Sequence, residues 1–272
     1  MLETIASPRC SIVALAAPLL ALAACQREPQ PAPAPAEKSE TPPVVTVAPA
    51  PVLDRAGVLG AMDIGASAFA AGHEVGGASL TGRRFVVRQA FGCGKPDEAA
   101  ETAADGLATV AWAKDRRTLK FSLAPADWLQ SGLIGRDDSG LEAVEGFWLE
   151  RPWLRTEACP AMAPGASTSD QSSPQTVGLA AVFKANGART GRRNGRAYEL
   201  TLRGEDGQSP VPSAQGYRLV LEGRMAAFAD GRAIHCRAAA ADQRPVCIGA
   251  VQLDRVAFED ADGQMLSEWR DG

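Results

Sequence analysis

The sequence predicts a mainly β protein, an antiparallel sandwich or barrel-like sheet with one or two short helices, stabilised by disulfides. Three observations support this fold class. Apolar and polar residues alternate with a period of two in many segments after Arg83, which is typical of half-buried strands. Turn-forming pairs such as Asp230-Gly231 and Asp262-Gly263 separate these segments. The later part of the chain also holds an even set of four cysteines.

A helix is predicted directly after Pro51. Asp54 is a suitable N-cap, Gly72 ends the segment, and four apolar residues between them recur at helical spacing: Leu59, Met62, Ala66 and Phe69. Glycines at positions 57, 60 and 65 lower the intrinsic helix propensity of this segment. We therefore expect the helix to depend on packing against the rest of the domain.

Strands are predicted on both sides of a second, shorter helix. Residues 83–91 alternate as a strand, and residues 106–124 are typical of a β-hairpin. Pro125 suits the first turn of a helix, so a short helix is predicted over residues 125–135, followed by extended structure over 146–160. Further strands are predicted over residues 176–185, 196–204, 216–228, 246–260 and 264–269, with a β-bulge at Asp254-Arg255.

Composition divides the chain into a leader, a spacer and a globular part. Residues 11–24 form an apolar run of signal-peptide length, too short to span a bilayer. Residues 25–51 are rich in Pro and Ala, which indicates an extended tether. The globular part is predicted to comprise a β-rich half with the leading helix (52–162), a linker or long loop (163–175) and a second β half (176–272). The two halves either share one core or form two domains.

The end of the apolar run carries a recognisable motif. Leu22-Ala23-Ala24-Cys25 resembles the lipobox of bacterial lipoproteins. The resemblance implies that residues 1–24 are a signal peptide and that Cys25 is lipidated and anchored by acyl chains such as palmitate. Gln26, where inner-membrane lipoproteins tend to carry Asp, implies the periplasmic face of the outer membrane. The alternative is a conventional secretory signal that leaves Cys25 a free thiol. The segments FGCG, GFWLERPW and EACP resemble uncharacterised proteobacterial lipoproteins, and this second resemblance implies no activity.

The remaining cysteines are Cys93, Cys159, Cys236 and Cys247, apart from Cys10 in the leader. In an oxidising compartment such a set forms disulfides. We favour the pairs Cys93–Cys159 and Cys236–Cys247, because each bond then lies within one half of the chain. Zinc binding is the competing use, but the chain has no C-x-x-C pair and two histidines. The sequence therefore predicts no metal and no other cofactor.

Charge and motifs exclude several classes of function. The net charge of −4 provides no basic field for nucleic acid. The chain contains no G-x-S-x-G, H-E-x-x-H, P-loop or G-x-G-x-x-G motif. His73 lies in a glycine-rich connection and His235 on a predicted strand, so both have ordinary structural interpretations. The sequence thus identifies no catalytic residue and favours a protein that is not an enzyme.

Two patches are candidates for binding. Trp148 and Trp153, with Arg151 between them, offer indoles that could stack on a sugar ring or a partner peptide, or that could instead cover a disulfide. Arg192 and Arg193 lie in the arginine-rich loop 188–196, which could hold phosphate or carboxylate groups or simply protect a hairpin end.

Acidic clusters are the remaining candidates for catalysis. They are Asp137-Asp138, Glu142 with Glu145, and Glu259-Asp260 with Asp262. Turn and cap roles also explain them. The sequence therefore favours a membrane-anchored periplasmic lipoprotein with a non-catalytic domain that binds an envelope polymer or a periplasmic protein. The alternatives are a cell-wall hydrolase that uses carboxylates brought together by the fold, and an inhibitor of a lytic enzyme.

Overall fold

The fold is described from a computed structural model. It covers residues 50–73, 79–94, 96–98, 105–134, 140–161, 175–204 and 208–270. The predicted signal peptide, the lipidated Cys25, almost all of the predicted tether and almost all of the predicted linker 163–175 lie outside these residues.

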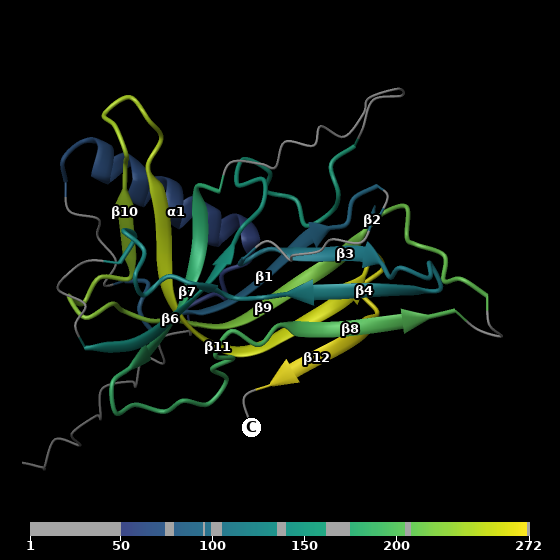
Figure 1. The fold of residues 1–272 in the computed structure, drawn as a ribbon. Helices are drawn as coiled ribbons and strands as arrows, with labels where there is room; N and C mark the ends of the chain where they lie inside the picture. Colours follow the sequence, from purple (N-terminus) through teal and green to yellow (C-terminus); the bar gives the residue numbers. More distant parts are fainter. Residues whose placement is uncertain are drawn as a thin grey trace, which may run out of the picture. The chain divides into compact units, whose positions relative to one another are not determined.

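Two β-sheets form most of the described part of the chain and confirm the predicted β class (Figure 1). The larger sheet contains β1 (Arg84–Phe91), β5 (Ala126–Asp127), β6 (Leu141–Trp148), β7 (Val177–Lys184), β9 (Tyr217–Met225), β10 (Ile234–Arg237), β11 (Val246–Asp260) and β12 (Met265–Arg270). The smaller sheet contains β2 (Asp97–Glu98), β3 (Ala108–Trp112), β4 (Thr118–Leu123) and β8 (Tyr198–Arg203).

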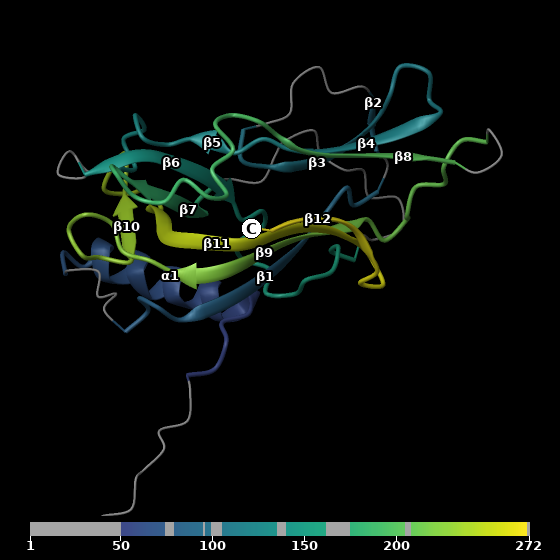
Figure 2. The same cartoon turned by 90° about the horizontal axis from the view of Figure 1, so that it is seen from below.

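The two sheets pack face to face through aromatic side chains. In Figure 2, β3, β4 and β8 form one layer, and β1, β9, β11 and β12 lie in the layer beneath it. Phe121 of β4 contacts Tyr217 of β9 edge to face, with ring centroids 4.6 Å apart, and lies 6.0 Å from the ring of Phe258 in β11. These aromatic contacts between the two sheets form part of the core of a β-sandwich.

Strand pairing is mainly antiparallel, as predicted, with two parallel exceptions. The hairpin β3–β4 pairs Ala108 with Leu123, and β11 returns through β12 around Asp262-Gly263. The predicted bulge is present, because the pairing of β11 with β9 shifts register between Leu253 and Arg255. However, β7 pairs with β11 in parallel, and so does β2 with β3. Both sheets are therefore mixed.

The predicted leading helix is α1 (Arg55–Ala70), capped by Asp54, whose carboxylate accepts a 2.7 Å hydrogen bond from the N–H of Gly57. Leu59 and Met62 are buried as expected, together with Val58. Phe69, which the pattern placed on the same buried face, is instead exposed. The buried residues of the helix therefore lie between Arg55 and Gly65, and α1 packs against β1, β10 and β11.

The second predicted helix, over residues 125–135, is wrong. Ala126–Asp127 forms the short strand β5, which pairs with β6, and the N–H of Trp128 donates a 3.0 Å hydrogen bond to the carbonyl of Val144. The Trp128 indole covers Gly146 and Gly178, at which an added Cβ would lie 2.0 and 2.5 Å from the ring. Burial of this indole fixes the segment in an extended path and overrides the helix-start signal of Pro125.

Both predicted disulfides are present: Cys93–Cys159 and Cys236–Cys247. The largest buried apolar cluster contains residues from both predicted halves of the chain, among them Phe85 and Phe147 from the first and Leu219 and Phe258 from the second. Within the described residues, no helix is long and apolar enough to cross a bilayer.

Candidate functional site

The larger sheet splits along one edge of β11. On that edge β7 pairs with Cys247–Val251 and β12 pairs with Arg255–Glu259. Among the described residues no strand pairs with the intervening residues 252–254 on this edge. The three strands therefore leave a wedge between the end of β7 and the end of β12.

A groove of about 950 Å³ occupies this wedge. We call it the split-sheet groove. Its walls come from the end of β7, the middle of β11 and the end of β12, and the arginine-rich loop 188–196 borders it. Phe183, Tyr198 and Trp269 supply aromatic surface, and Glu145 and Arg193 supply charge. This volume lies near the upper end of the usual range for small-molecule sites, about 300 to 1,000 Å³.

Glu145 of β6 is the buried polar group of the groove. Its side chain lines the groove although the residue is only 7% exposed. Oε1 accepts 2.8 Å hydrogen bonds from the main-chain N–H groups of both Arg193 and Asn194. Oε2 has no hydrogen-bond partner among the described residues, and it is not fully enclosed by protein. Burial raises the pKa of Glu145, and the two N–H donors and nearby arginines only partly oppose this effect.

The arginine-rich loop is fastened to β6 by two carboxylates. Glu142 binds Arg189 at 2.7 Å and also forms an ion pair with Arg192, while Glu145 holds the main chain of Arg193 and Asn194. The hydrogen bonds of Glu142 to Arg189 and Arg192 lower the pKa of its carboxyl group. The Arg192 side chain is 21% exposed and is bound to Glu142, which it shares with Arg189, so Arg192 is poorly placed to bind an external anion.

Arg193, the second predicted binding arginine, does line the groove. Its guanidinium lies over the ring of Tyr198, with Cζ 4.5 Å from the ring centroid, and donates to the carbonyls of Arg196 and Ala197 at 3.2 and 2.8 Å. These contacts fix the side chain as part of the groove wall.

The other cations of the groove are largely balanced by acids. Arg255 contacts Glu268 at 3.0 Å and Glu222 at 3.4 Å, and Arg270 also contacts Glu268 at 3.0 Å. Asp254, the second carboxylate lining the groove, lies 3.9 Å from Arg224. Lys184 also lines the groove and forms no ion pair within the described residues, so the site is polar and aromatic with an excess of cations.

The structure does not bring the predicted tryptophan patch to this groove. Trp148 is half-buried and packs against Trp128 with ring centroids 4.6 Å apart. It alternates with Glu145 and Phe147 across β6 and belongs to the second apolar cluster. Trp153 is 59% exposed in the turn after β6 and does not line the groove.

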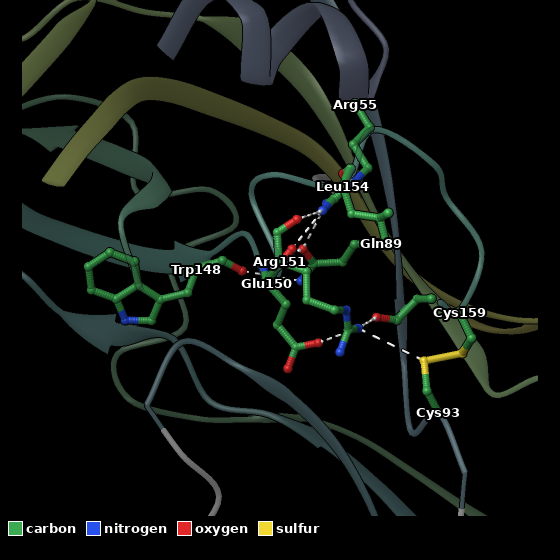
Figure 3. A network of polar contacts seen from close by, with 9 residues as sticks. Arg55, Gln89, Cys93, Trp148, Glu150, Arg151, Leu154 and Cys159 are labelled. Atoms are coloured by element: carbon green, nitrogen blue, oxygen red, sulfur yellow. Dashed lines mark hydrogen bonds and ion pairs between the residues drawn. A yellow bond between two sulfur atoms is a disulfide. The ribbon is translucent and has the colours of Figure 1, made fainter. Parts of the chain in front are cut away.

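Arg151 belongs to a buried polar network that joins α1 to the segment after β6 (Figure 3). It forms a 2.7 Å ion pair with Glu150, donates to the carbonyl of Ala90 and lies 3.9 Å from the sulfur of Cys93. Arg55 donates to the main-chain oxygens of Glu150, Arg151 and Leu154. These contacts give Arg151 a structural role beside the Cys93–Cys159 disulfide.

Burial affects the ionisable groups of this network. Burial and the neighbouring Arg151 lower the pKa of Arg55 to about 10. Burial also raises the pKa of the Glu150 carboxyl group, although both arginines oppose that effect.

The remaining predicted candidates lie elsewhere. Asp137 and Asp138 are outside the described residues. Glu259 forms a 3.3 Å ion pair with Arg88, and Asp260 accepts hydrogen bonds from the turn residues Asp262 and Gln264. His235 stacks on Phe228 with ring centroids 3.9 Å apart and contacts Asp230 at 3.1 Å, which are structural roles.

The sequence reasoning missed Tyr198 and Trp269 as groove residues. Both occupy apolar positions of alternating strands, and that signal predicts only core packing. The open oxygen of Glu145 has no sequence signal, because it depends on how a loop 48 residues later docks on β6. Comparison with known proteins does not supply the function: the chain matches no family model, no curated protein and no solved structure.

Proposed function

We propose that this chain is a lipid-anchored lipoprotein of the periplasmic face of the outer membrane, and that its β domain binds an envelope ligand or periplasmic protein in the split-sheet groove without transforming it. The tetrad Leu22–Cys25, Gln26 and the Pro/Ala-rich stretch 25–51 support the anchor and the tether. The groove supports the binding function, because it combines an open shape with a carboxylate group, that of Glu145, in its lining.

The single observation that carries the proposal is the state of Glu145. Two main-chain N–H groups fix one of its oxygens, while the other faces the groove with no partner among the described residues. Because this oxygen is not fully enclosed by protein, it is open to a hydrogen bond from a ligand that donates to it. The groove can therefore bind a ligand that donates a hydrogen bond to Glu145.

The proposal is tested by filling the groove. Thr190 and Ala227 line it and are not part of the core, so the double variant Thr190→Trp/Ala227→Trp is designed to block it. Val211, which is 92% exposed and does not line the groove, gives the matched control Val211→Trp.

The three full-length proteins, in mild detergent, are immobilised and exposed to solubilised envelope. Retained wall fragments and proteins are quantified by mass spectrometry. We expect material that is retained by the original chain and by Val211→Trp and lost from the double variant. Equal retention by all three proteins would remove the groove from the proposed function.

Glu145 also gives the alternative of a wall hydrolase its only specific support, because a carboxyl group with a raised pKa in an open groove is suited to general acid catalysis. The assay is release of soluble fragments from purified cell wall. Release by the original chain that falls at least a hundredfold in Glu145→Gln would favour hydrolysis. Equal background with both proteins favours binding alone.

A further inference from the structure

We infer that the split-sheet groove takes an extended peptide segment, whose main chain pairs with the short edge of β11, between β7 and β12, that no described strand covers. The inference rests on the proposed binding function and names the chemistry of its ligand. It depends on the direction of main-chain groups at the split, on the aromatic side chains of the groove and on the second oxygen of Glu145.

Main-chain groups of β11 point into the groove at the split. The N–H of Ala250 donates to Ala233 and its carbonyl accepts from Ala226, so the groups of Ala250 face the β9 and β10 edge. Successive residues of a strand turn these groups to opposite edges. The N–H and carbonyl of Leu253 therefore face the opposite edge, beyond the last pairing with β7 at Val251.

The end of β7 contributes a group of the same kind. The N–H of Leu149 donates to the carbonyl of Val177, so Val177 faces β6. The last residue of β7 that pairs with β11 is Ala181. By the same alternation, the main-chain groups of the next residue, Val182, face β11. The carbonyl of Val182 and the main-chain groups of Leu253 thus border the wedge from its two sides. Free strand edges of this kind bind an added strand.

The side chains of the groove are suited to an extended peptide. Arg255 and Arg270 contact the same carboxylate, that of Glu268, and Arg193 is held on Tyr198 and two carbonyls. Lys184 also lines the groove and forms no ion pair within the described residues, so the lining carries more cations than acids. On one face of the groove the apolar side chains Phe183 and Trp269 suit alternate residues of an extended peptide, while Glu145 accepts from a main-chain N–H, a hydroxyl or an amide group.

The free edge is tested first in the full-length protein without any ligand. Amide hydrogen exchange is measured by NMR at Val251, Leu253 and Val256. We expect the amide of Leu253 to exchange at least tenfold faster than those of Val251 and Val256, which belong to paired segments on both sides of β11. Equal protection of the three amides would show that the edge is already occupied and would overturn the inference.

The ligand class is tested with a displayed library of seven-residue peptides restricted to Ala, Val, Ile, Thr, Ser, Asn, Gln and Gly. Enriched peptides are synthesised with free and with N-methylated main-chain amides at alternate positions. N-methylation keeps the side chains and removes donors for strand pairing. We expect methylation to weaken binding at least tenfold in one of the two alternations and to have a smaller effect in the other.

Variants of the protein locate the bound peptide. Glu145→Gln keeps an oxygen for the N–H groups of Arg193 and Asn194 and replaces the open oxygen by a donor, so we expect at least fivefold weaker peptide binding. Glu199→Gln changes an exposed carboxylate of β8 that does not line the groove, and it should bind the peptide as the original chain does.

Three outcomes overturn the inference. They are a library with no enriched sequence, peptides whose affinity is unchanged by N-methylation in either alternation, and binding of glycan fragments to the groove in place of peptides. If the groove-filling variant still loses envelope material in any of these cases, the proposed binding function stands and only the peptide assignment fails. If that variant also behaves like the original chain, both fail.

Discussion

Arg55 and Glu150 lie 95 positions apart in the sequence, yet Nη2 of Arg55 donates a 2.6 Å hydrogen bond to the main-chain oxygen of Glu150. The same guanidinium reaches the carbonyls of Arg151 and Leu154 and the side-chain oxygen of Gln89. One buried cation at the start of α1 therefore satisfies several acceptors of the turn that follows β6. This turn leads toward Cys159, so the helix, the turn and the disulfide form one connected unit.

Removal of the Arg55 guanidinium should destabilise the domain strongly. Arg55→Ala removes the donor of the Glu150 and Leu154 carbonyls and one of the two donors of the Arg151 carbonyl, and we expect the free energy of unfolding to fall by about 2 to 4 kcal/mol. Urea denaturation followed by tryptophan fluorescence measures the change. Arg83→Ala is the control, because Arg83 donates to one exposed carbonyl, that of Pro51, and its loss should cost less than about 1 kcal/mol. Equal effects of the two variants would contradict the role assigned to Arg55.

Contact between Trp128 and Gly146 should make that glycine intolerant of a methyl group. An added Cβ at Gly146 would lie 2.0 Å from the indole, whereas one at Gly140 would meet no atom within 4 Å. We expect Gly146→Ala to lower the free energy of unfolding by about 1 to 3 kcal/mol through overpacking. The midpoint of thermal unfolding checks this, with Gly140→Ala as the matched control that should leave it nearly unchanged. A stable Gly146→Ala variant would mean that the indole packs elsewhere.

Glu145 should make stability depend on pH in a defined direction. Its pKa is raised in the folded state, so folding favours the protonated form. The contribution of this group is fully present below the ordinary pKa of 4.5 and is lost as the pH rises through the folded-state value. Glu145→Gln removes the titration, so its stability relative to the original chain should improve between pH 4 and pH 7.5. Urea denaturation at the two pH values measures this difference, and a constant difference would show that Glu145 titrates normally.

Replacement of Cys25 should release the protein from membranes. The proposed anchor requires the thiol of Cys25, so Cys25→Ala should move most of the protein to the soluble fraction after cell fractionation and carbonate washing. Cys10→Ala, which changes the leader but keeps the proposed lipidation site, should remain membrane-bound. Membrane association of the Cys25→Ala protein through the wash would be inconsistent with lipid anchoring at this residue.

Local patterns predicted much of this fold. Alternation located β1, β8 and β9, because apolar residues of these strands share one face. Residues 176–185 were also predicted as a strand, and β7 is buried on both faces over its first five residues. The sequence Asp262-Gly263 predicted the return of β11 through β12, and Asp54 predicted the start of α1. The preference for bonds that lie within one half of the chain also identified both disulfides. These features depend on neighbouring residues or on simple proximity along the chain.

The features that the sequence did not predict depend on distant contacts. The parallel pairing of β7 with β11 joins segments about 70 positions apart. It could not be predicted from a turn sequence, because no single turn connects the two strands. The burial of Trp128 depends on glycines in two other strands and replaces a predicted helix by an extended segment. Arg192 and Arg193 were predicted to bind a ligand, but the structure gives both of them contacts within the protein. These contacts also depend on residues that are distant in the sequence. Their carboxylate partners Glu142 and Glu145 lie on β6, and only the fold brings them together.

The segment by which the chain enters the domain, just before α1, is held by main-chain hydrogen bonds. Leu53 forms a parallel bridge with Phe85: its N–H donates to Arg84 at 2.9 Å and its carbonyl accepts from Val86 at 2.8 Å. Arg55, two residues later, is fixed by the network described above. The chain therefore meets the two hydrogen bonds of Leu53 first and the contacts of Arg55, the first residue of α1, directly afterwards. The N-terminal end of the domain is consequently attached to β1 and to the turn after β6, and not to α1 alone.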